Sequence, residues 1–145
     1  MKLNEKMIVE LKEIEDDYKR AYQLISYLFK DKVDKANKSY INHLVRVSEK
    51  LKNPNTRIAG LLHDSIEDIN DFTANDLREL KFNEDIITLV QIVTNIPAKN
   101  KTYHEKITTI INSNNMEAIK LKYADISDNY SIERLNQLDE KTRKY

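Results

Sequence analysis

The sequence predicts an all-α protein, and three observations support this fold class. The 145 residues include one glycine and two prolines, which are too few for the many turns of a β architecture. Apolar residues recur at intervals of three and four, the period of an amphipathic helix. Thr73 with Asp76 and Thr102 with Glu105 have the spacing of a capping box, which opens a helix.

The first half of the chain predicts helices on either side of one polar break. The apolar stripe over residues 7–29 fits one long helix or two consecutive helices. The polar stretch 30–39 interrupts this pattern, and a helix is expected over 40–51. The turn at 53–56 leads into a helix that should run to about Asp68.

The second half of the chain predicts four more helices. A short helix follows the capping box at Thr73, and another, capped by Asn83, runs through residue 93. Residues 95–101 contain a proline and are predicted to be a loop. The last two helices are expected over 102–112 and from residue 116 onward.

Composition restricts the functions open to this chain. It carries 24 basic and 24 acidic side chains, so it lacks the excess positive charge that non-specific nucleic-acid binding requires. It contains no cysteine, which excludes disulfides, thiolate chemistry and Cys-ligated zinc. The lone glycine excludes Gly-rich phosphate loops, because these need several glycines.

Length and hydropathy predict one cytoplasmic domain over residues 1–145. A chain of this size buries roughly two-thirds of its unfolded surface, which is enough for one hydrophobic core. No apolar run approaches the roughly 20 residues of a membrane span, and the N-terminus lacks the apolar core of a signal peptide. We therefore expect neither a nucleic acid nor a membrane as a partner.

A group of polar residues marks one face of the helix expected to end near residue 68. At 100° per residue, Gly60, His63, Asp64, Glu67 and Asp68 share an arc of about 140°. The arc contains no lysine or arginine, so its three carboxylates would repel one another without a cation. Two interpretations remain open: a solvated acidic face, or a divalent metal site in which the histidine supplies a nitrogen ligand.

Two further residues could complete such a metal site. His43 shares a helix face with Tyr40 and points inward, either as a ligand or as an ordinary buried histidine with a hydrogen-bond partner. Asp125 lies in the final helix, where it could bind a metal or pair with Lys122 at the surface. His104 lies among charged residues near a helix start, and we expect it to be exposed.

Four segments carry motifs that occur together in one family. They are DKANKSYINHLVRVS at 34–48, HDSIEDI at 63–69, TYHE at 102–105 and KYADISDN at 122–129. Together they resemble the HD-domain metal-dependent phosphohydrolases over about residues 22–135. More narrowly, HDSIEDI is similar to the HDxxED motif of the stand-alone (p)ppGpp hydrolases of the Rel/SpoT type. The resemblance implies a single HD-domain helical bundle.

The resemblance also implies a metal site. Residue by residue, it makes His43, His63, Asp64 and Asp125 the ligands of one divalent metal, with Mn²⁺ the expected ion. A metal held in this way lowers the pKa of a bound water molecule and neutralises charge on phosphate oxygens. This favours the metal interpretation of the polar arc over the solvated face.

Further roles follow from the same resemblance. Glu67 and Asp68 match the acidic pair that positions and activates the attacking water, with a carboxylate as general base. Lys35 matches a contact to the substrate phosphates, and Asn129 matches a residue of the substrate pocket. From the sequence alone, an ordinary surface lysine is the alternative interpretation of Lys35.

Four positions depart from the family pattern. Asp34 fits the stand-alone members, but the long bifunctional enzymes carry there an arginine that packs on the guanine base. Asn37, Ser39 and Ile126 replace a glycine, a proline and an arginine. Only residues 130–145 follow the last motif, where family members generally carry further helices. The pocket wall is therefore expected either to be thinner or to be completed by a second subunit of a homo-oligomer.

Three hypotheses on function result from these observations. The first is a Mn²⁺-dependent hydrolase that releases pyrophosphate from the 3′ position of (p)ppGpp. The second keeps the metal site but hydrolyses another nucleotide. The third is a nucleotide-binding regulatory module with weak catalysis, which would have no need of the pair formed by Glu67 and Asp68.

Overall fold

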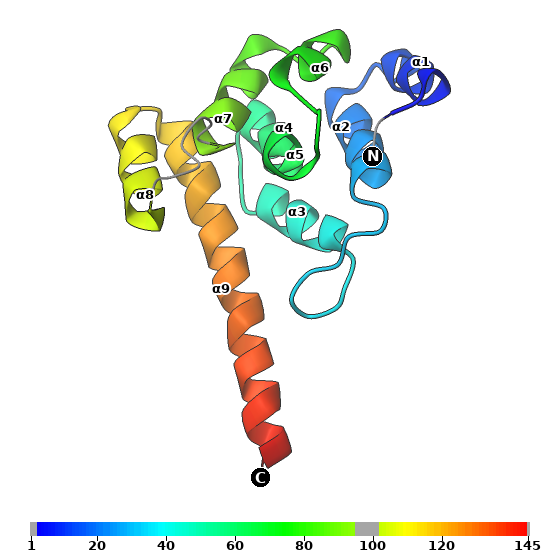
Figure 1. Cartoon of the computed structure of the whole chain (residues 1–145). Coiled ribbons are helices and arrows are strands. Elements are labelled where there is room, and N and C mark those ends of the chain that lie inside the picture. Colours follow the sequence, from blue (N-terminus) through cyan, green and yellow to red (C-terminus); the bar gives the residue numbers. More distant parts are fainter. Residues whose placement is uncertain (1–2, 95–101, 145) are drawn as a thin grey trace.

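The structure is a computed structural model that describes residues 3–94 and 102–144, with side chains as far as residue 130. Within these ranges the chain forms nine helices and no β-strand, which confirms the all-α prediction (Figure 1). In chain order the helices are α1 (Glu5–Glu13), α2 (Asp17–Leu28), α3 (Tyr40–Glu49), α4 (Pro54–Leu62), α5 (Ser65–Asp68), α6 (Ala74–Glu79), α7 (Glu84–Thr94), α8 (Tyr103–Asn112) and α9 (Met116–Lys144).

The N-terminal apolar stripe forms two helices rather than one. Asp16 separates them as the N-cap of α2, and its carboxylate accepts a hydrogen bond from the Lys19 backbone at 2.8 Å. The guanidinium of Arg20 is buried and donates to the carbonyls of Ile14 at 2.6 Å and of Lys81 at 3.1 Å. These contacts join the α1–α2 corner to the segment between α6 and α7.

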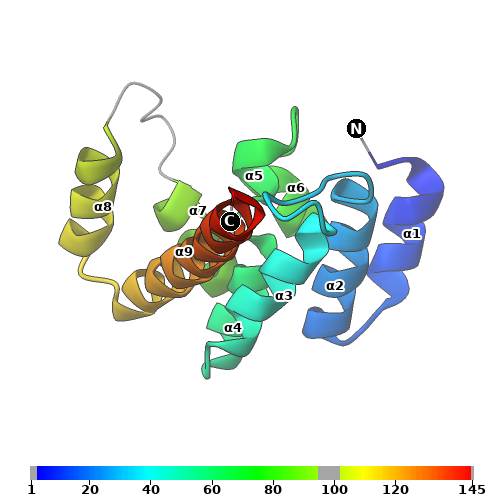
Figure 2. The same ribbon diagram turned by 90° about the horizontal axis from the view of Figure 1, so that it is seen from below.

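The hydrophobic core is built around α4. This helix packs against α2, α3, α7 and α9, so its residues lose contact with water on nearly every side. Ala59, Leu61 and Leu62 are fully buried there, and each leucine contributes about 1.5–3 kcal/mol by burial. Figure 2 shows α9 with α8 on one side and α3, α2 and α1 on the other.

The predicted helix over 54–68 is interrupted, which corrects the sequence analysis. α4 ends at Leu62 and α5 begins at Ser65. Nδ1 of His63 bonds to the carbonyl of Gly60 at 2.6 Å, and the hydroxyl of Ser65 donates to the carbonyl of Leu62 at 2.6 Å. These side chains take up carbonyls at the end of α4, as polar side chains do where they compete with a helix.

The later helices begin where the capping signals predict. Thr73 and Asp76 form the capping box of α6, and the side chain of Asn83 accepts from the Ile86 backbone at 2.9 Å in the first turn of α7. The Thr102 hydroxyl caps α8. The loop predicted at 95–101 lies outside the described residues. No helix in the described part of the chain has the length and apolar character needed to cross a membrane.

Gly60 lies where α4 packs directly against the backbone of α3. A Cβ atom at this position would be 3.2 Å from the Ser48 backbone Cα and 3.2 Å from the Leu51 side chain. Contacts to backbone atoms cannot be relieved by a change of rotamer. The absence of a side chain therefore allows the two helices to approach each other.

We expect Gly60→Val to lower the free energy of unfolding by about 1–3 kcal/mol, because its branched side chain must push α3 away. Urea denaturation followed by circular dichroism measures this change. Thr88→Val, at an exposed position of α7, is the matched control and should stay within about 0.5 kcal/mol of the parent protein. Equal stability of the two variants would contradict the close approach.

Candidate metal centre

Four side chains from three separate parts of the chain meet at one point in the core. His43 belongs to α3, His63 and Asp64 lie between α4 and α5, and Asp125 belongs to α9. One ligand atom from each residue lies within 4.8 Å of the others, and all four residues are buried. The structure therefore brings together the four residues that the sequence resemblance names as metal ligands.

Hydrogen bonds fix the orientation of both imidazoles. Nδ1 of His63 donates to the carbonyl of Gly60 at 2.6 Å, and Nδ1 of His43 donates to Asp128 Oδ2 at 2.6 Å. Each ring consequently turns Nε2 toward Asp125 Oδ1, at 3.1 Å from His63 and 3.0 Å from His43. A hydrogen bond to one ring nitrogen is the usual device that directs the other nitrogen to a metal.

The carboxylates and imidazoles of this cluster stabilise one another's charged forms. Burial disfavours the charged form of Asp125, but hydrogen bonds from His43 and His63 outweigh it and lower the pKa of this carboxyl. Burial also disfavours protonation of His63, but the carboxylates of Asp64 and Asp125 raise its pKa to about 9. Lys122 pairs with Asp125 at 3.2 Å, so this ion pair exists alongside the histidine contacts rather than in place of them.

This donor set fits a divalent metal ion. Two imidazole nitrogens and two carboxylate oxygens form a mixed nitrogen and oxygen site of the kind that suits Mn, Fe and Zn. Two atoms that bind one ion at about 2.1 Å lie at most about 4.2 Å apart. The observed spread of 4.8 Å therefore requires only small side-chain movements.

Asp128 is a residue of this site that the sequence analysis missed. It is buried, and its carboxylate accepts from Arg46 Nε at 2.8 Å and from Nδ1 of His43. Burial opposes its ionisation, but these hydrogen bonds lower the pKa of its carboxyl. One signal was available: Asp128 lies three residues after Asp125, so the two carboxylates share a face of α9.

Tyr40 also contacts the cluster, and this contact was not predicted from the sequence. Its hydroxyl donates a hydrogen bond to Asp64 Oδ2. Burial and the charge of Asp64 raise the pKa of this phenol, which therefore keeps its proton. The tyrosine thus holds one oxygen of a candidate ligand in a fixed direction.

The acidic pair lies outside the four-ligand group. Glu67 and Asp68 are both exposed, in the short helix that follows Asp64. Lys32 Nζ lies 2.7 Å from Asp68 Oδ2 and so partly neutralises this carboxylate. Desolvation, together with the charges of Asp64 and Asp68, raises the pKa of Glu67. A carboxylate with a raised pKa is a better proton acceptor near neutral pH.

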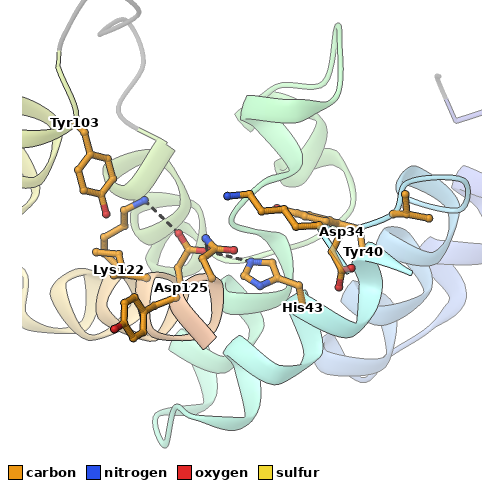
Figure 3. Close-up of a pocket in the computed structure, with 11 residues that line it drawn as sticks. Asp34, Tyr40, His43, Tyr103, Lys122 and Asp125 are labelled. Carbon is orange, nitrogen blue, oxygen red and sulfur yellow. Dashed lines mark hydrogen bonds and ion pairs between the residues drawn. The ribbon is translucent and has the colours of Figure 1, made fainter. Parts of the chain in front are cut away.

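A cavity of about 580 Å³ opens beside His43 and Asp125 (Figure 3). Both residues predicted to contact substrate, Lys35 and Asn129, line it. Asn129 also donates to Asp125 Oδ1 at 3.4 Å. The volume of the cavity is in the range of ordinary small-molecule sites. His104 is exposed on α8, as predicted.

Asp34 has a structural part in the loop before α3. Its carboxylate is only 6% exposed, and Oδ1 accepts from the backbones of Ala36 at 2.8 Å and Lys38 at 3.0 Å. These hydrogen bonds close a tight turn that includes Asn37, which has a φ of 60°. Asparagine tolerates this left-handed conformation, so it can replace the glycine of the family pattern.

We expect metal binding to depend on pH because His63 must lose a proton to bind. With a pKa of about 9, His63 is protonated at neutral pH in the metal-free protein. The apparent Mn²⁺ affinity should then rise about tenfold per pH unit below that pKa and level off above it. Calorimetric titration in buffers of different ionisation enthalpy measures the released proton, and a pH-independent affinity would contradict this expectation.

Asp128→Asn tests the hydrogen bond behind His43. The variant loses the charge that orients the imidazole, so its Mn²⁺ affinity should fall about 10–100-fold. Calorimetry measures the affinity, and circular dichroism checks that the fold is retained. Asp85→Asn, at an exposed position of α7, is the matched control and should bind Mn²⁺ like the parent protein. Equal affinity in both variants would exclude this role.

Comparison with known proteins agrees with this geometry. Residues 21–126, well over half of the chain, match the family model described as the HD domain. A search of curated proteins found no match. The matched range contains all four residues of the buried cluster, and HD domains bind divalent metals. The chain therefore belongs to the HD-domain family, within the HD phosphohydrolase superfamily, whose members are metal-dependent hydrolases, and its buried His/Asp cluster could hold a divalent metal.

Proposed function

We propose that this chain is a Mn²⁺-dependent hydrolase that releases pyrophosphate from the 3′ position of (p)ppGpp. The main support is the convergence of four buried ligand atoms within 4.8 Å, next to a cavity lined by Lys35 and Asn129. The HDxxED motif supports the finer assignment, because it adds an exposed acidic pair directly after the ligands. A site for the metal alone would not need that pair.

In this proposal His43, His63, Asp64 and Asp125 hold one divalent ion. When bound, the ion lowers the pKa of a water molecule and neutralises charge on phosphate oxygens. The two histidines bind through Nε2, because Nδ1 of His63 is hydrogen-bonded to the Gly60 carbonyl and Nδ1 of His43 to the Asp128 carboxylate. Protonation of His63, whose pKa is raised to about 9, competes with this binding.

Glu67 is the proposed general base. Its raised pKa suits a group that must take a proton from the attacking water. Asp68, held by Lys32 at 2.7 Å, has the proposed role of orienting that water. The water oxygen forms a bond to the phosphorus carried by the ribose 3′ oxygen, and the bond between phosphorus and that oxygen breaks. The 3′ oxygen takes up a proton, and the products are pyrophosphate and GDP or GTP.

One observation favours a second candidate, the hydrolysis of another nucleotide. The carboxylate of Asp34 is buried in its own turn, so this position offers no group to pack on a guanine base. The metal cluster and the acidic pair do not depend on that contact. The same chemistry could therefore serve a different base or a different phosphate arrangement.

The direct test is to incubate the purified protein with Mn²⁺ and ppGpp and to measure pyrophosphate and GDP. Release of both products, abolished by EDTA, is the expected result. Orthophosphate as the product from a panel of other nucleotides would favour the second candidate. Absence of turnover on every nucleotide, from protein that holds one metal ion per chain, would contradict the proposal.

Glu67→Gln tests the proposed base. Turnover should fall by about 10²–10⁴-fold, because an amide cannot accept the proton, while bound metal remains at one ion per chain. Metal content is measured by elemental analysis of the same preparation. Glu79→Gln, at an exposed position of α6, is the matched control. Turnover of Glu67→Gln equal to that of the control would remove this residue from the mechanism.

A further inference from the structure

The cavity beside the metal cluster has two chemically different walls. Figure 3 shows Asp34 and Tyr40 on one side of His43, with Lys122 and Tyr103 on the side of Asp125. Tyr130 and Ile126 also line the cavity and belong to α9. The wall formed by α8 and α9 is thus rich in aromatic and apolar surface.

The two tyrosines of this wall are largely open to solvent. Tyr103 is 61% exposed and Tyr130 is 63% exposed, although each borders the cavity. Tyr103 is the first residue of α8, directly after the N-cap Thr102, whose side chain accepts from the Glu105 backbone. Exposed aromatic rings around a cavity mark a surface that binds a ligand, and flat rings stack on other flat rings.

The opposite wall offers no comparable ring. The Tyr40 hydroxyl is bonded to Asp64, and Lys32 lies over the Tyr40 ring at 4.2 Å. The Asp34 carboxylate is turned into the backbone of its own loop. Among the described residues that line the cavity, the rings open to a planar ligand are therefore those of Tyr103 and Tyr130.

Positive charge lies between the tyrosine wall and the metal cluster. Lys122 Nζ is 3.2 Å from Asp125 Oδ2, and Figure 3 shows its side chain between Tyr103 and Asp125. Lys35 adds a second lysine to the cavity lining. A ligand that fits this order has a planar ring at one end and an anionic group at the other.

We infer that Tyr103 and Tyr130 form a base-binding wall for a nucleoside polyphosphate. The base lies against the two rings, and the phosphates pass Lys122 toward His43 and Asp125. Every base has an aromatic face, so stacking selects nucleotides over other phosphate compounds without selecting one base. This inference names the substrate contact of the proposed function and rests on it only for the location of the reacting phosphate.

Equilibrium binding tests the inference without requiring turnover. GDP and inorganic pyrophosphate are titrated calorimetrically into the Mn²⁺-loaded protein and into Tyr103→Ala and Tyr130→Ala. Loss of one stacking contact should weaken GDP binding about tenfold and leave pyrophosphate binding within about twofold. Tyr103→Phe and Tyr130→Phe keep the ring and should bind GDP like the parent protein.

Tyr123→Ala is the matched control. This tyrosine is also on α9 and is 73% exposed, but it lines a different cavity. Its GDP affinity should be unchanged. Unchanged GDP binding in both wall variants would overturn the inference, and so would an equal loss of GDP and pyrophosphate binding. GDP binding that depends on these rings, in a protein that does not hydrolyse ppGpp, would sustain the inference while the proposed function fails.

Discussion

The carboxylate of Asp125 connects three parts of the chain, namely α9, α3 and the end of α4. Its Oδ1 atom lies 3.0 Å from Nε2 of His43 on α3 and 3.1 Å from Nε2 of His63 at the end of α4. A buried carboxylate without partners would cost several kcal/mol, so the contacts of Asp125 to both histidines stabilise this position of α9. The apolar contacts of α4 supply the packing energy, and this polar contact determines which faces of the helices meet.

The break between α4 and α5 gives the site its two parts. His63 and Asp64 turn inward to the buried cluster, whereas Glu67 and Asp68 remain exposed. A continuous helix would keep these residues on one shared arc. The bond from Nδ1 of His63 to the Gly60 carbonyl both ends α4 and directs Nε2 to the cluster. One hydrogen bond thus connects local backbone structure to the chemistry of the site.

Much of this arrangement could be predicted from local sequence. The capping residues Thr73, Asn83 and Thr102 identify the starts of three helices because a cap acts within one turn. His43 could be placed inward from helical periodicity alone. The break after Leu62 could not, because it depends on side chains that compete for backbone carbonyls.

The residues that orient the candidate ligands could not be predicted from local sequence either. Arg46 and Asp128 are 82 positions apart in the chain, so only the tertiary fold brings them together. The family motifs name the four clustered residues but carry no information on which groups orient them. The motifs do not specify the ion or the nucleotide either, because this donor set accepts several ions and the cavity residues fit more than one nucleotide.

The contact between Arg46 and Asp128 also bears on the valence of an ion that the centre can accept. Asp128 has a cationic partner at 2.8 Å, so its charge is balanced before any ion binds. The other two buried carboxylates, Asp64 and Asp125, carry two negative charges toward the centre. An ion of charge two would cancel the charge of these two carboxylates, whereas a monovalent or trivalent ion would leave a net charge among the four ligands. Lys122, 3.2 Å from Asp125 Oδ2, adds one positive charge beside the ligand group. The charge of the ligand group therefore selects the charge of the bound ion, whereas it does not select one element among the divalent ions.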